Sequence, residues 1–246
     1  RGQGPWEGTY QLSHVRGQPL CETWGMARVL CLDFDDTIVM ENTARLVFER
    51  FAAPAWRDRE ADYRAGRLTV EQFNAAALLT VSATRDELRA FCADTVTLRP
   101  GFLEALDWAL WNGWTPVVVS NGFDFYVDAV LDKAGVDRVA RHAGRTRFDY
   151  RWQVTYLSPR GIELEAGYKL SYAAAFKGVG DFVAYVGDGA SDIEAAKLAR
   201  VVFARDALLR TLEGSHPRVY AFETFHDVIA VLDRESPAWA EDAASS

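Results

Sequence analysis

The sequence predicts an α/β fold, in which a doubly wound parallel sheet carries a small helical cap inserted after its first strand. Two observations lead to this fold class. Three apolar runs, Val29–Leu32, Pro116–Val119 and Phe182–Val186, have the length and composition of buried parallel strands. Segments with helical patterns alternate with these runs, and strands that alternate with helices form a parallel sheet covered on both faces.

Helical patterns fill the interval from about Met40 to Leu98, between the first and second strands. Its first helix has an apolar face made of Ala44, Val47, Phe48 and Phe51. Two capping boxes, Thr69-x-x-Gln72 and Thr84-x-x-Glu87, predict the starts of two further helices.

The remaining elements alternate along the chain after Arg99. The predicted helices are Phe102–Trp111, Phe123–Ala134, Lys169–Phe176 and Ser191–Ala199, followed by one from Asp206 and one from Thr224. The further predicted strands are one or two exposed ones within 147–158, then Val201–Ala204 and Val219–Phe222.

This order gives a predicted division of the chain into four parts. They are an N-terminal extension at 1–25, a core at 26–39 and 99–235, a helical cap at 40–98, and a flexible tail at 236–246. Residues 1–25 are rich in Gly, Gln, Pro and Trp and show no sustained hydrophobic period, and residues 236–246 are mostly small and polar.

Composition excludes several classes of protein. A net charge of -8 over 246 residues argues against a nucleic-acid partner, which would require a basic face. No apolar run approaches the roughly 18 residues that span a bilayer, so no membrane association is expected. The three cysteines, Cys21, Cys31 and Cys92, have no paired spacing, which indicates a reducing compartment and a cytoplasmic location.

Polar residues gather where the three strands end. Asp33 and Asp35 follow the first strand, Ser120 the second, and Asp188 and Asp192 the third. The carboxyl ends of parallel strands are where ligands bind in such sheets. Four converging carboxylates would repel one another unless cations met them, and oxygen ligands without His or Cys favour Mg²⁺. Lys169 would supply a further positive charge.

Each of these residues also has an ordinary structural explanation when taken alone, as a helix cap, a turn or a solvated helix start. Their order is what resembles a known family. Four segments are similar to the signature motifs of the haloacid dehalogenase (HAD) superfamily: Asp33-x-Asp35-x-Thr37, Ser120, Lys169 and Gly187-Asp188-Gly189-x-x-Asp192.

Within the superfamily, the chain resembles the phosphoserine-phosphatase-like branch from about Ala27 to Leu232. It is most similar to the methionine-salvage group, whose substrate is 2-hydroxy-3-keto-5-methylthiopentenyl-1-phosphate. That narrower likeness rests on Phe51–Trp56, Ser120–Phe125 and Val202–Asp206.

The resemblance implies a Mg²⁺-dependent phosphatase that acts on a small phosphorylated metabolite. Asp33 would be the nucleophile that forms an aspartyl-phosphate, and Asp35 the general acid and then base. Metal ligands would come from the carboxylates of Asp33 and Asp188 and the backbone carbonyl of Asp35, with Asp192 orienting this shell. The groups expected to hold phosphoryl oxygens are Thr37, Ser120, Asn121, Gly122 and Lys169.

The helical block at 40–98 resembles the small cap of this HAD branch, which implies that it closes over the carboxyl ends of the strands and excludes water there. Substrate choice is expected to depend on this cap and on the loop after Ser120. Phosphoserine phosphatases carry a glutamate nine residues after the nucleophile, where this chain has Asn42, with Glu41 beside it. This departure counts against phosphoserine, although a shift of one residue would restore an acid there. The methionine-salvage likeness implies a small uncharged keto-enol phosphate, with Asn42, Phe48, Trp56 and Phe125 as the expected contacts.

Three other functions are compatible with the sequence. They are phosphoserine hydrolysis, phosphotransfer or mutase activity with the same aspartyl-phosphate, and a non-catalytic role as an interaction module on the same scaffold. A dehalogenase is disfavoured because it would have no use for Asp35. The sequence does not predict the oligomeric state.

Overall fold

The structure is a computed structural model that describes residues 27–244. Within this range lies a seven-stranded sheet in the order β4-β3-β2-β1-β5-β6-β7, in which every neighbouring pair is parallel except β3 and β4. The strands are β1 (Arg28–Leu32), β2 (Trp114–Phe123), β3 (Ala140–Asp149), β4 (Arg151–Thr155), β5 (Phe182–Gly187), β6 (Val201–Ala204) and β7 (Val219–Ala221). This order confirms the predicted doubly wound α/β fold.

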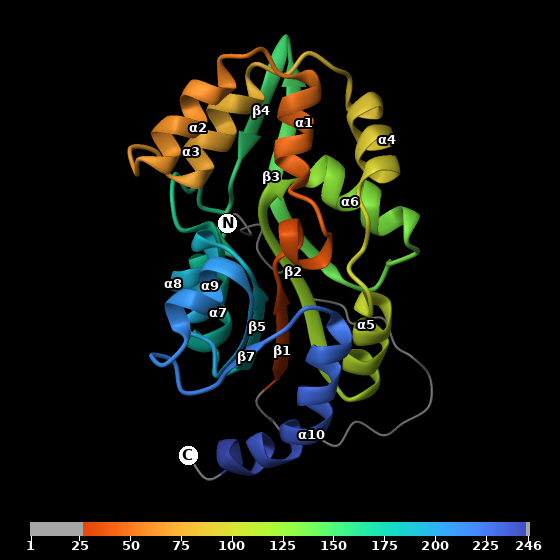
Figure 1. Ribbon diagram of the computed structural model, residues 1–246, viewed down its shortest axis with the longest axis vertical. Helices are drawn as coiled ribbons and strands as arrows, with labels where there is room; N and C mark the ends of the chain where they lie inside the picture. The colour runs from red at the N-terminus through yellow and green to blue at the C-terminus, as the bar shows by residue number, and fades with distance from the viewer. Residues whose placement is uncertain (1–26, 245–246) are drawn as a thin grey trace, which may run out of the picture.

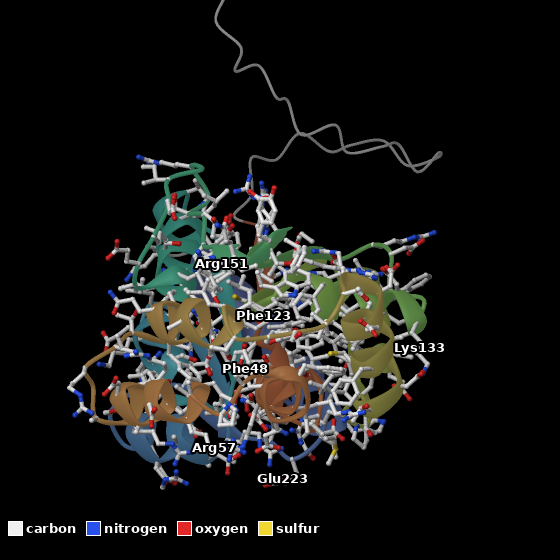
Figure 2. The ribbon with its side chains drawn as sticks, turned by 90° about the horizontal axis from the view of Figure 1, so that it is seen from above. Phe48, Arg57, Phe123, Lys133, Arg151 and Glu223 are labelled. Atoms are coloured by element: carbon white, nitrogen blue, oxygen red, sulfur yellow. The ribbon has the colours of Figure 1, made fainter. Side chains whose placement is uncertain are left out.

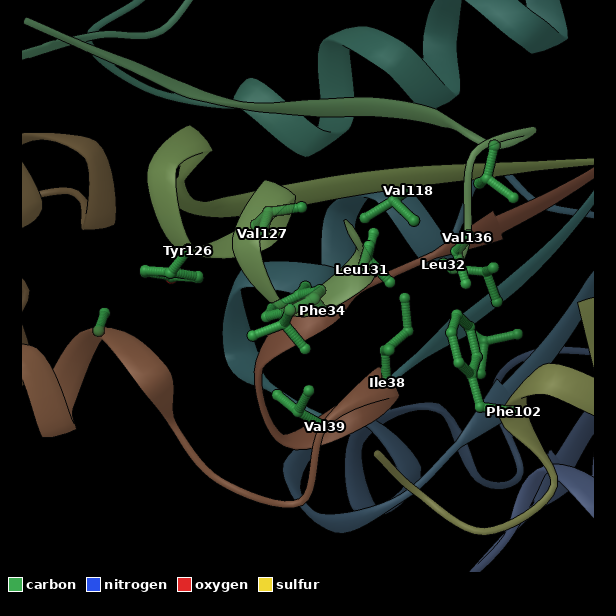
Figure 3. Packing of buried hydrophobic residues seen from close by; sticks show 14 of the residues in the cluster. Leu32, Phe34, Ile38, Val39, Phe102, Val118, Tyr126, Val127, Leu131 and Val136 are labelled. Atoms are coloured by element: carbon green, nitrogen blue, oxygen red, sulfur yellow. The ribbon is translucent and has the colours of Figure 1, made fainter. Parts of the chain in front are cut away.

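Helices cover both faces of the sheet (Figure 1). One face carries α5 (Phe102–Trp111), α6 (Asp124–Lys133) and α10 (Phe225–Ala244), and the other carries α7 (Tyr168–Gly178), α8 (Ile193–Ala196) and α9 (Asp206–Leu212). Side chains of a strand alternate between the faces. Leu30 and Leu32 of β1 accordingly join the first core, while Val29 and Cys31 join the second. Figure 3 shows Leu32 among apolar residues of the first core.

Four helices between β1 and α5 form the predicted cap beyond the carboxyl ends of the strands (Figure 1). They are α1 (Thr43–Phe51), α2 (Trp56–Arg64), α3 (Val70–Leu78) and α4 (Arg85–Thr95). Both capping boxes are present, with Thr69 and Thr84 accepting hydrogen bonds from the backbone N–H groups of Gln72 and Glu87.

Two connections join these helices to the sheet. Val39 and Leu98 form an antiparallel bridge, and the N–H of Arg99 donates to the carbonyl of Ile38 at 2.8 Å. The two connections therefore run side by side. The exact division into cap and core stays a prediction, and the predicted extension at 1–25 lies outside the described residues.

Three segments differ from expectation. β3 and β4 form a hairpin that begins at Ala140, earlier than predicted, and Trp152 in it is buried because its ring packs on Phe125 and its Nε1 donates to the carbonyl of Ala83. The predicted helix at 191–199 is shorter, with α8 ending at Ala196.

The third difference is the predicted tail from Ser236. Helix α10 continues to Ala244 instead, and Trp239 stacks on Phe182 with ring centroids 5.9 Å apart. Burial of this indole stabilises the end of the helix against the sheet. Among the described residues, none of the helices combines the length and apolar character needed to cross a membrane.

Candidate active site

The parallel register of the sheet brings the predicted polar residues to one edge. The last residue of β1 is aligned with Val118 of β2 and Val186 of β5. Asp33 follows at once, and its N–H donates to the carbonyl of Val186 at 3.0 Å. Ser120 and Asp188 each lie two residues beyond their aligned valines, so the three side chains emerge at the same edge.

Lys169 lies between two carboxylates at this edge. Its Nζ is 2.7 Å from Oδ1 of Asp33 and 2.7 Å from Oδ1 of Asp192. All three side chains are buried. Burial alone would lower the pKa of Lys169, but the charges of Asp192 and Asp33 outweigh it and raise that pKa, so the ammonium is charged at neutral pH.

Asp192 is held by four hydrogen-bond donors. Its Oδ1 accepts from Lys169 and from the hydroxyl of Tyr185 at 2.7 Å, and its Oδ2 accepts from the backbone N–H groups of Asp188 and Gly189 at 3.2 and 2.9 Å. These donors occupy the lone pairs of the carboxylate. The side chain therefore fixes the loop that carries Asp188 and has little capacity left for a metal.

Two glycines allow close approach at this edge. A Cβ on Gly187 would lie 2.8 Å from Cγ of Asp192, and a Cβ on Gly122 would lie 1.8 Å from the hydroxyl oxygen of Tyr126. Any side chain at either position would therefore displace a neighbour that belongs to the site.

The acidic cluster fits a divalent cation. Carboxylate oxygens of Asp33, Asp188 and Asp192 lie within 4.8 Å of one another. Three carboxylates against the single ammonium of Lys169 leave two negative charges. Burial, followed by the charge of Asp192, raises the pKa of Asp188 to about 7 and raises that of Asp33. A bound Mg²⁺ would remove this repulsion, with Asp33 and Asp188 as the carboxylates free to hold it.

Asp35 lines the same cavity as Asp33 and Asp188, as expected, but its side chain is not part of the group of three carboxylates that lie within 4.8 Å of one another. Its Oδ1 accepts from the backbone N–H of Thr43 at 2.7 Å and its Oδ2 from the hydroxyl of Tyr126 at 2.5 Å. Burial raises the pKa of Asp35, while these two hydrogen bonds oppose the shift. The carboxyl group faces the same cavity as Asp33.

The turn after Asp33 is stabilised by Arg99 and Asn42, which are not part of the acidic cluster. Asp36 has a positive φ of 58°. The buried guanidinium of Arg99 donates to the carbonyl of Thr37 at 2.7 Å and to that of Asp36 at 2.5 Å. Asn42 caps α1 and also donates to the carboxylate of Asp36 at 2.9 Å. These contacts stabilise a backbone conformation that L-residues rarely adopt.

The segment after Val119 lines the cavity with Ser120, Asn121 and Gly122. The N–H of Gly122 donates to Oγ of Ser120 at 2.9 Å, and the side chain of Asn121 donates to Glu71 at 3.1 Å. Thr37 differs from expectation, because it is fully buried and its hydroxyl donates to Oδ1 of Asp188 at 3.1 Å. Its hydroxyl thus contacts a candidate metal ligand and not the space above Asp33.

A cavity of about 460 Å³ lies between the strand ends and the cap. Asp33, Asp35, Ser120, Lys169 and Asp188 are among its lining residues. The apolar residues that line it from the cap are Ala44, Phe48, Trp56, Val70 and Phe73, and the polar ones are Asn42, Arg45, Glu60, Tyr63, Arg64 and Asn74. In the view from above, Phe48 of the cap lies near Phe123 of β2 (Figure 2), with ring centroids 5.9 Å apart.

Three of the four predicted substrate contacts, Asn42, Phe48 and Trp56, line this cavity. Phe125 does not. Its ring is fully buried and packs on Phe123 and Trp152, since it lies on the side of α6 that faces the core. The prediction of a substrate contact for Phe125 is therefore wrong.

Comparison with known proteins decides the family. A family model described as haloacid dehalogenase-like hydrolase matches residues 30–197. The chain belongs to the HAD hydrolases. A 2-hydroxy-3-keto-5-methylthiopentenyl-1-phosphate phosphatase from Exiguobacterium is 31% identical over 83% of this chain and 96% of its own length. One from Bacillus cereus is 30% identical over 82% and 93%.

Solved structures agree on the fold of this HAD phosphatase. A phospho-aspartyl intermediate analogue of phosphoserine phosphatase is similar with a TM-score of 0.61 and 20% identity, over 84% of this chain and 99% of that one. A probable phosphoserine phosphatase from Vibrio cholerae gives a TM-score of 0.65 and 18% identity, over 87% and 67%. The suspected family, the fold and the enzyme class are thereby confirmed.

Several residues of the HAD phosphatase site were not predicted. Tyr126 and Arg99 contact the turn after Asp33 from positions distant in sequence, and no local sequence pattern marks them. Glu71 lies in the first turn of α3, where an acid is ordinarily explained by the helix dipole. Only the structure reveals that Glu71 and Asn74 are buried and contact Asn121.

Proposed function

We propose that this HAD phosphatase hydrolyses a small phosphomonoester through an aspartyl-phosphate on Asp33, with Mg²⁺ as its cofactor. The placement of Lys169, 2.7 Å from both Asp33 and Asp192 at the floor of the cavity, supports this most strongly. The ammonium of Lys169 lowers the pKa of Asp33 against the rise that burial causes, and a bound Mg²⁺ would add to this effect, so that Asp33 would be ionised and ready to attack. The same charge would stabilise the phosphoryl group as it is transferred.

In the first step, a carboxylate oxygen of Asp33 attacks phosphorus and the bond from phosphorus to the leaving oxygen breaks. Asp35 donates its proton to that departing oxygen. Burial raises the pKa of Asp35, which favours the protonated form that an acid catalyst requires. Tyr126 and the N–H of Thr43 hold the carboxyl group in place.

In the second step, Asp35 removes a proton from a water molecule whose oxygen attacks phosphorus. The bond between phosphorus and the Asp33 oxygen then breaks, which releases inorganic phosphate and restores the Asp33 carboxylate. Ser120 and the backbone N–H groups of Asn121 and Gly122 would hold phosphoryl oxygens in both steps. Thr37 would act through Asp188, the residue to which its hydroxyl donates.

Asp33 and Asp188 would hold Mg²⁺ with their carboxylates and Asp35 with its backbone carbonyl, while Asp192 orients the loop of Asp188. Mg²⁺, when bound, withdraws negative charge from phosphoryl oxygens. The two uncompensated charges of the acidic cluster support a divalent ion at this place.

For the substrate we propose the ester named for the curated relatives, a small keto-enol phosphate with a methylthio end. The apolar part of the cavity, made by Phe48, Trp56 and Phe73, suits an uncharged tail. Asn42 stands where a carboxylate would be needed to meet an amino group. Phosphoserine remains the second candidate because Arg45, Glu60 and Arg64 line the same cavity and would suit a zwitterion.

Release of phosphate from a generic aryl phosphate tests the enzyme class and cofactor. We expect turnover with Mg²⁺, none with chelator, and recovery when Mg²⁺ is restored. The value of kcat/KM for the keto-enol ester should then exceed that for phosphoserine. Equal or reversed values would reject the substrate, and phosphate transfer to an added alcohol in place of water would indicate a phosphotransferase. A cytoplasmic location stays a prediction.

A further inference from the structure

We propose that three buried residues, Glu71 and Asn74 on α3 and Tyr156 after β4, are positioning residues that aim the Asn121–Gly122 peptide at the phosphoryl group. We call these three residues the Asn121 clamp. The inference rests on the proposed role of Ser120–Gly122 in holding phosphoryl oxygens, and it assigns to the cap a part in building that site.

The carbonyl oxygen of Asn121 is bonded from two sides. Nδ2 of Asn74 donates to it at 2.7 Å and the hydroxyl of Tyr156 donates at 2.6 Å. Asn74 also donates to the Tyr156 hydroxyl at 3.0 Å, so the donors are joined to each other. Both side chains are buried. A carbonyl oxygen has two lone pairs, and both are occupied here.

Planarity of the peptide bond carries this constraint to the next residue. In a trans peptide the C=O and the N–H point in opposite directions. Fixing the carbonyl of Asn121 therefore fixes the N–H of Gly122, which points to Oγ of Ser120 at 2.9 Å, among the residues that line the cavity. Gly122 has no Cβ to restrict its backbone, so the restriction must come from such neighbours. The two donated hydrogen bonds also polarise the amide and strengthen its N–H as a donor.

Glu71 holds the side chain of Asn121 and also contacts the residue before Lys169. Its Oε1 accepts from the side chain of Asn121 at 3.1 Å and from the backbone N–H of Tyr168 at 2.8 Å. Tyr168 is the first residue of α7, and Lys169 is the second. One buried carboxylate of the cap thus contacts both the phosphoryl-binding segment and the start of the helix that carries the catalytic lysine.

The contacts run from the cap helix α3 to β2 and to the start of α7 in the core. Helix α3 also lies beside β4 (Figure 1). The consequence is that the phosphoryl site is complete only when α3 is docked on the sheet edge. Binding energy from the part of the substrate under the cap would then be used to order the groups that hold its phosphate.

Substitutions that remove single donors test the clamp. Tyr156→Phe deletes one hydroxyl and keeps the ring, Asn74→Leu deletes the amide, and Glu71→Gln removes the charge. Tyr220→Phe is the matched control, since it deletes a hydroxyl that donates to the carboxylate of Glu235, and Tyr220 is not among the residues that line the cavity. The readouts are kcat/KM with the aryl phosphate and Mg²⁺, and the affinity for orthovanadate measured from the rise in melting temperature.

We expect Asn74→Leu to lower kcat/KM about 30-fold and Tyr156→Phe about fivefold, below the loss for deleting a direct oxyanion donor. Vanadate affinity should fall in parallel for both. The double variant should lose less than the product of the single effects, because both donors act on one carbonyl. Glu71→Gln should lower kcat/KM by about tenfold, and Tyr220→Phe should leave both readouts unchanged.

Native kcat/KM and native vanadate affinity in Tyr156→Phe and Asn74→Leu would overturn the inference, as would a fall in melting temperature alone. Absence of aryl phosphate turnover in the native chain would contradict the proposed function instead. Vanadate binding would in that case still decide whether the clamp orders an anion site.

Discussion

The floor and the roof of the cavity are built in contrasting ways. At the floor, Asp33, Lys169 and Asp192 are almost fully buried and each has fixed charged partners. The roof is formed by cap residues, among them the apolar side chains of Phe48, Trp56 and Phe73. Its charged residues Arg45 and Arg64 both form ion pairs with Glu60, and these pairs are partly exposed to water. The difference indicates that the chemistry is determined by the sheet edge and the choice of substrate by the cap.

Lys169→Met should have the largest effect. It removes the only ammonium described within the floor cluster and leaves three carboxylates, two of them buried, facing one another. We expect kcat to fall about 10³-fold or more, because the negative charge on the transferred phosphoryl group loses the ammonium that stabilises it. The free energy of unfolding should fall by about 3–5 kcal/mol in chelator. Lys133→Met, which breaks an exposed pair with Asp94, is the control and should retain native activity. Activity within tenfold of native in Lys169→Met would contradict the role of the floor.

The floor should also make the metal-free enzyme sensitive to pH. The pKa of Asp188 is raised to about 7 and that of Asp33 is raised as well, chiefly by burial. The folded state therefore binds these protons more tightly than the unfolded chain, so stability falls as pH rises from about 4 towards about 7.

In chelator, the melting temperature should thus be lower at about pH 8 than at about pH 6, and Mg²⁺ should abolish most of the difference by binding the ionised form. Asp188→Asn should flatten the dependence. A steeper loss of stability in Asp188→Asn would argue against this origin.

Changes in the roof should alter substrate choice more than chemistry. Trp56→Phe keeps an aromatic ring but enlarges the cavity. We expect KM for an ester with a long apolar tail to rise about three- to tenfold while kcat changes little. Small esters that do not reach the ring should show a smaller change. The control is Trp111→Phe, since Trp111 is 91% exposed and lies outside the cavity. A fall in kcat with unchanged KM would place Trp56 in the chemical step.

The smallest effect concerns the cap helix α4. Thr84 accepts from the N–H of Glu87 at 3.3 Å, and Thr84→Ala removes this cap. The free energy of unfolding should fall by about 1 kcal/mol, a typical value for a lost N-cap. Kinetic constants should stay native, which chemical denaturation and steady-state assays on one preparation would show. A large kinetic effect would mean that α4 also orders the site.

The contrast between floor and roof also explains what the sequence could predict. Asp33, Ser120 and Asp188 follow apolar strands directly, so local patterning and parallel pairing place them together. The capping boxes at Thr69 and Thr84 are equally local. Asp35 shows where this reasoning fails, because its partner Tyr126 is 91 residues away and decides where the carboxyl group points.

The clamp residues illustrate a second limit. Glu71 in the first turn of a helix has an ordinary explanation in the helix dipole, and only tertiary packing buries it against Asn121. Phe125 was misassigned for a related reason. Resemblance of its segment to a family motif does not specify which side of α6 the ring occupies, and that side faces Trp152 in the core. Orientation around a helix axis depends on packing that no short segment specifies.

Trapping the phosphorylated enzyme tests the central claim most directly. The native chain would be mixed with aryl phosphate and Mg²⁺, quenched in acid within one turnover, and digested for peptide mass spectrometry. We predict a phosphoryl group on Asp33, its absence in Asp33→Asn, and its accumulation in Asp35→Asn, where the second step lacks its base. A phosphoryl group on any other residue, or native turnover by Asp33→Asn, would contradict the account.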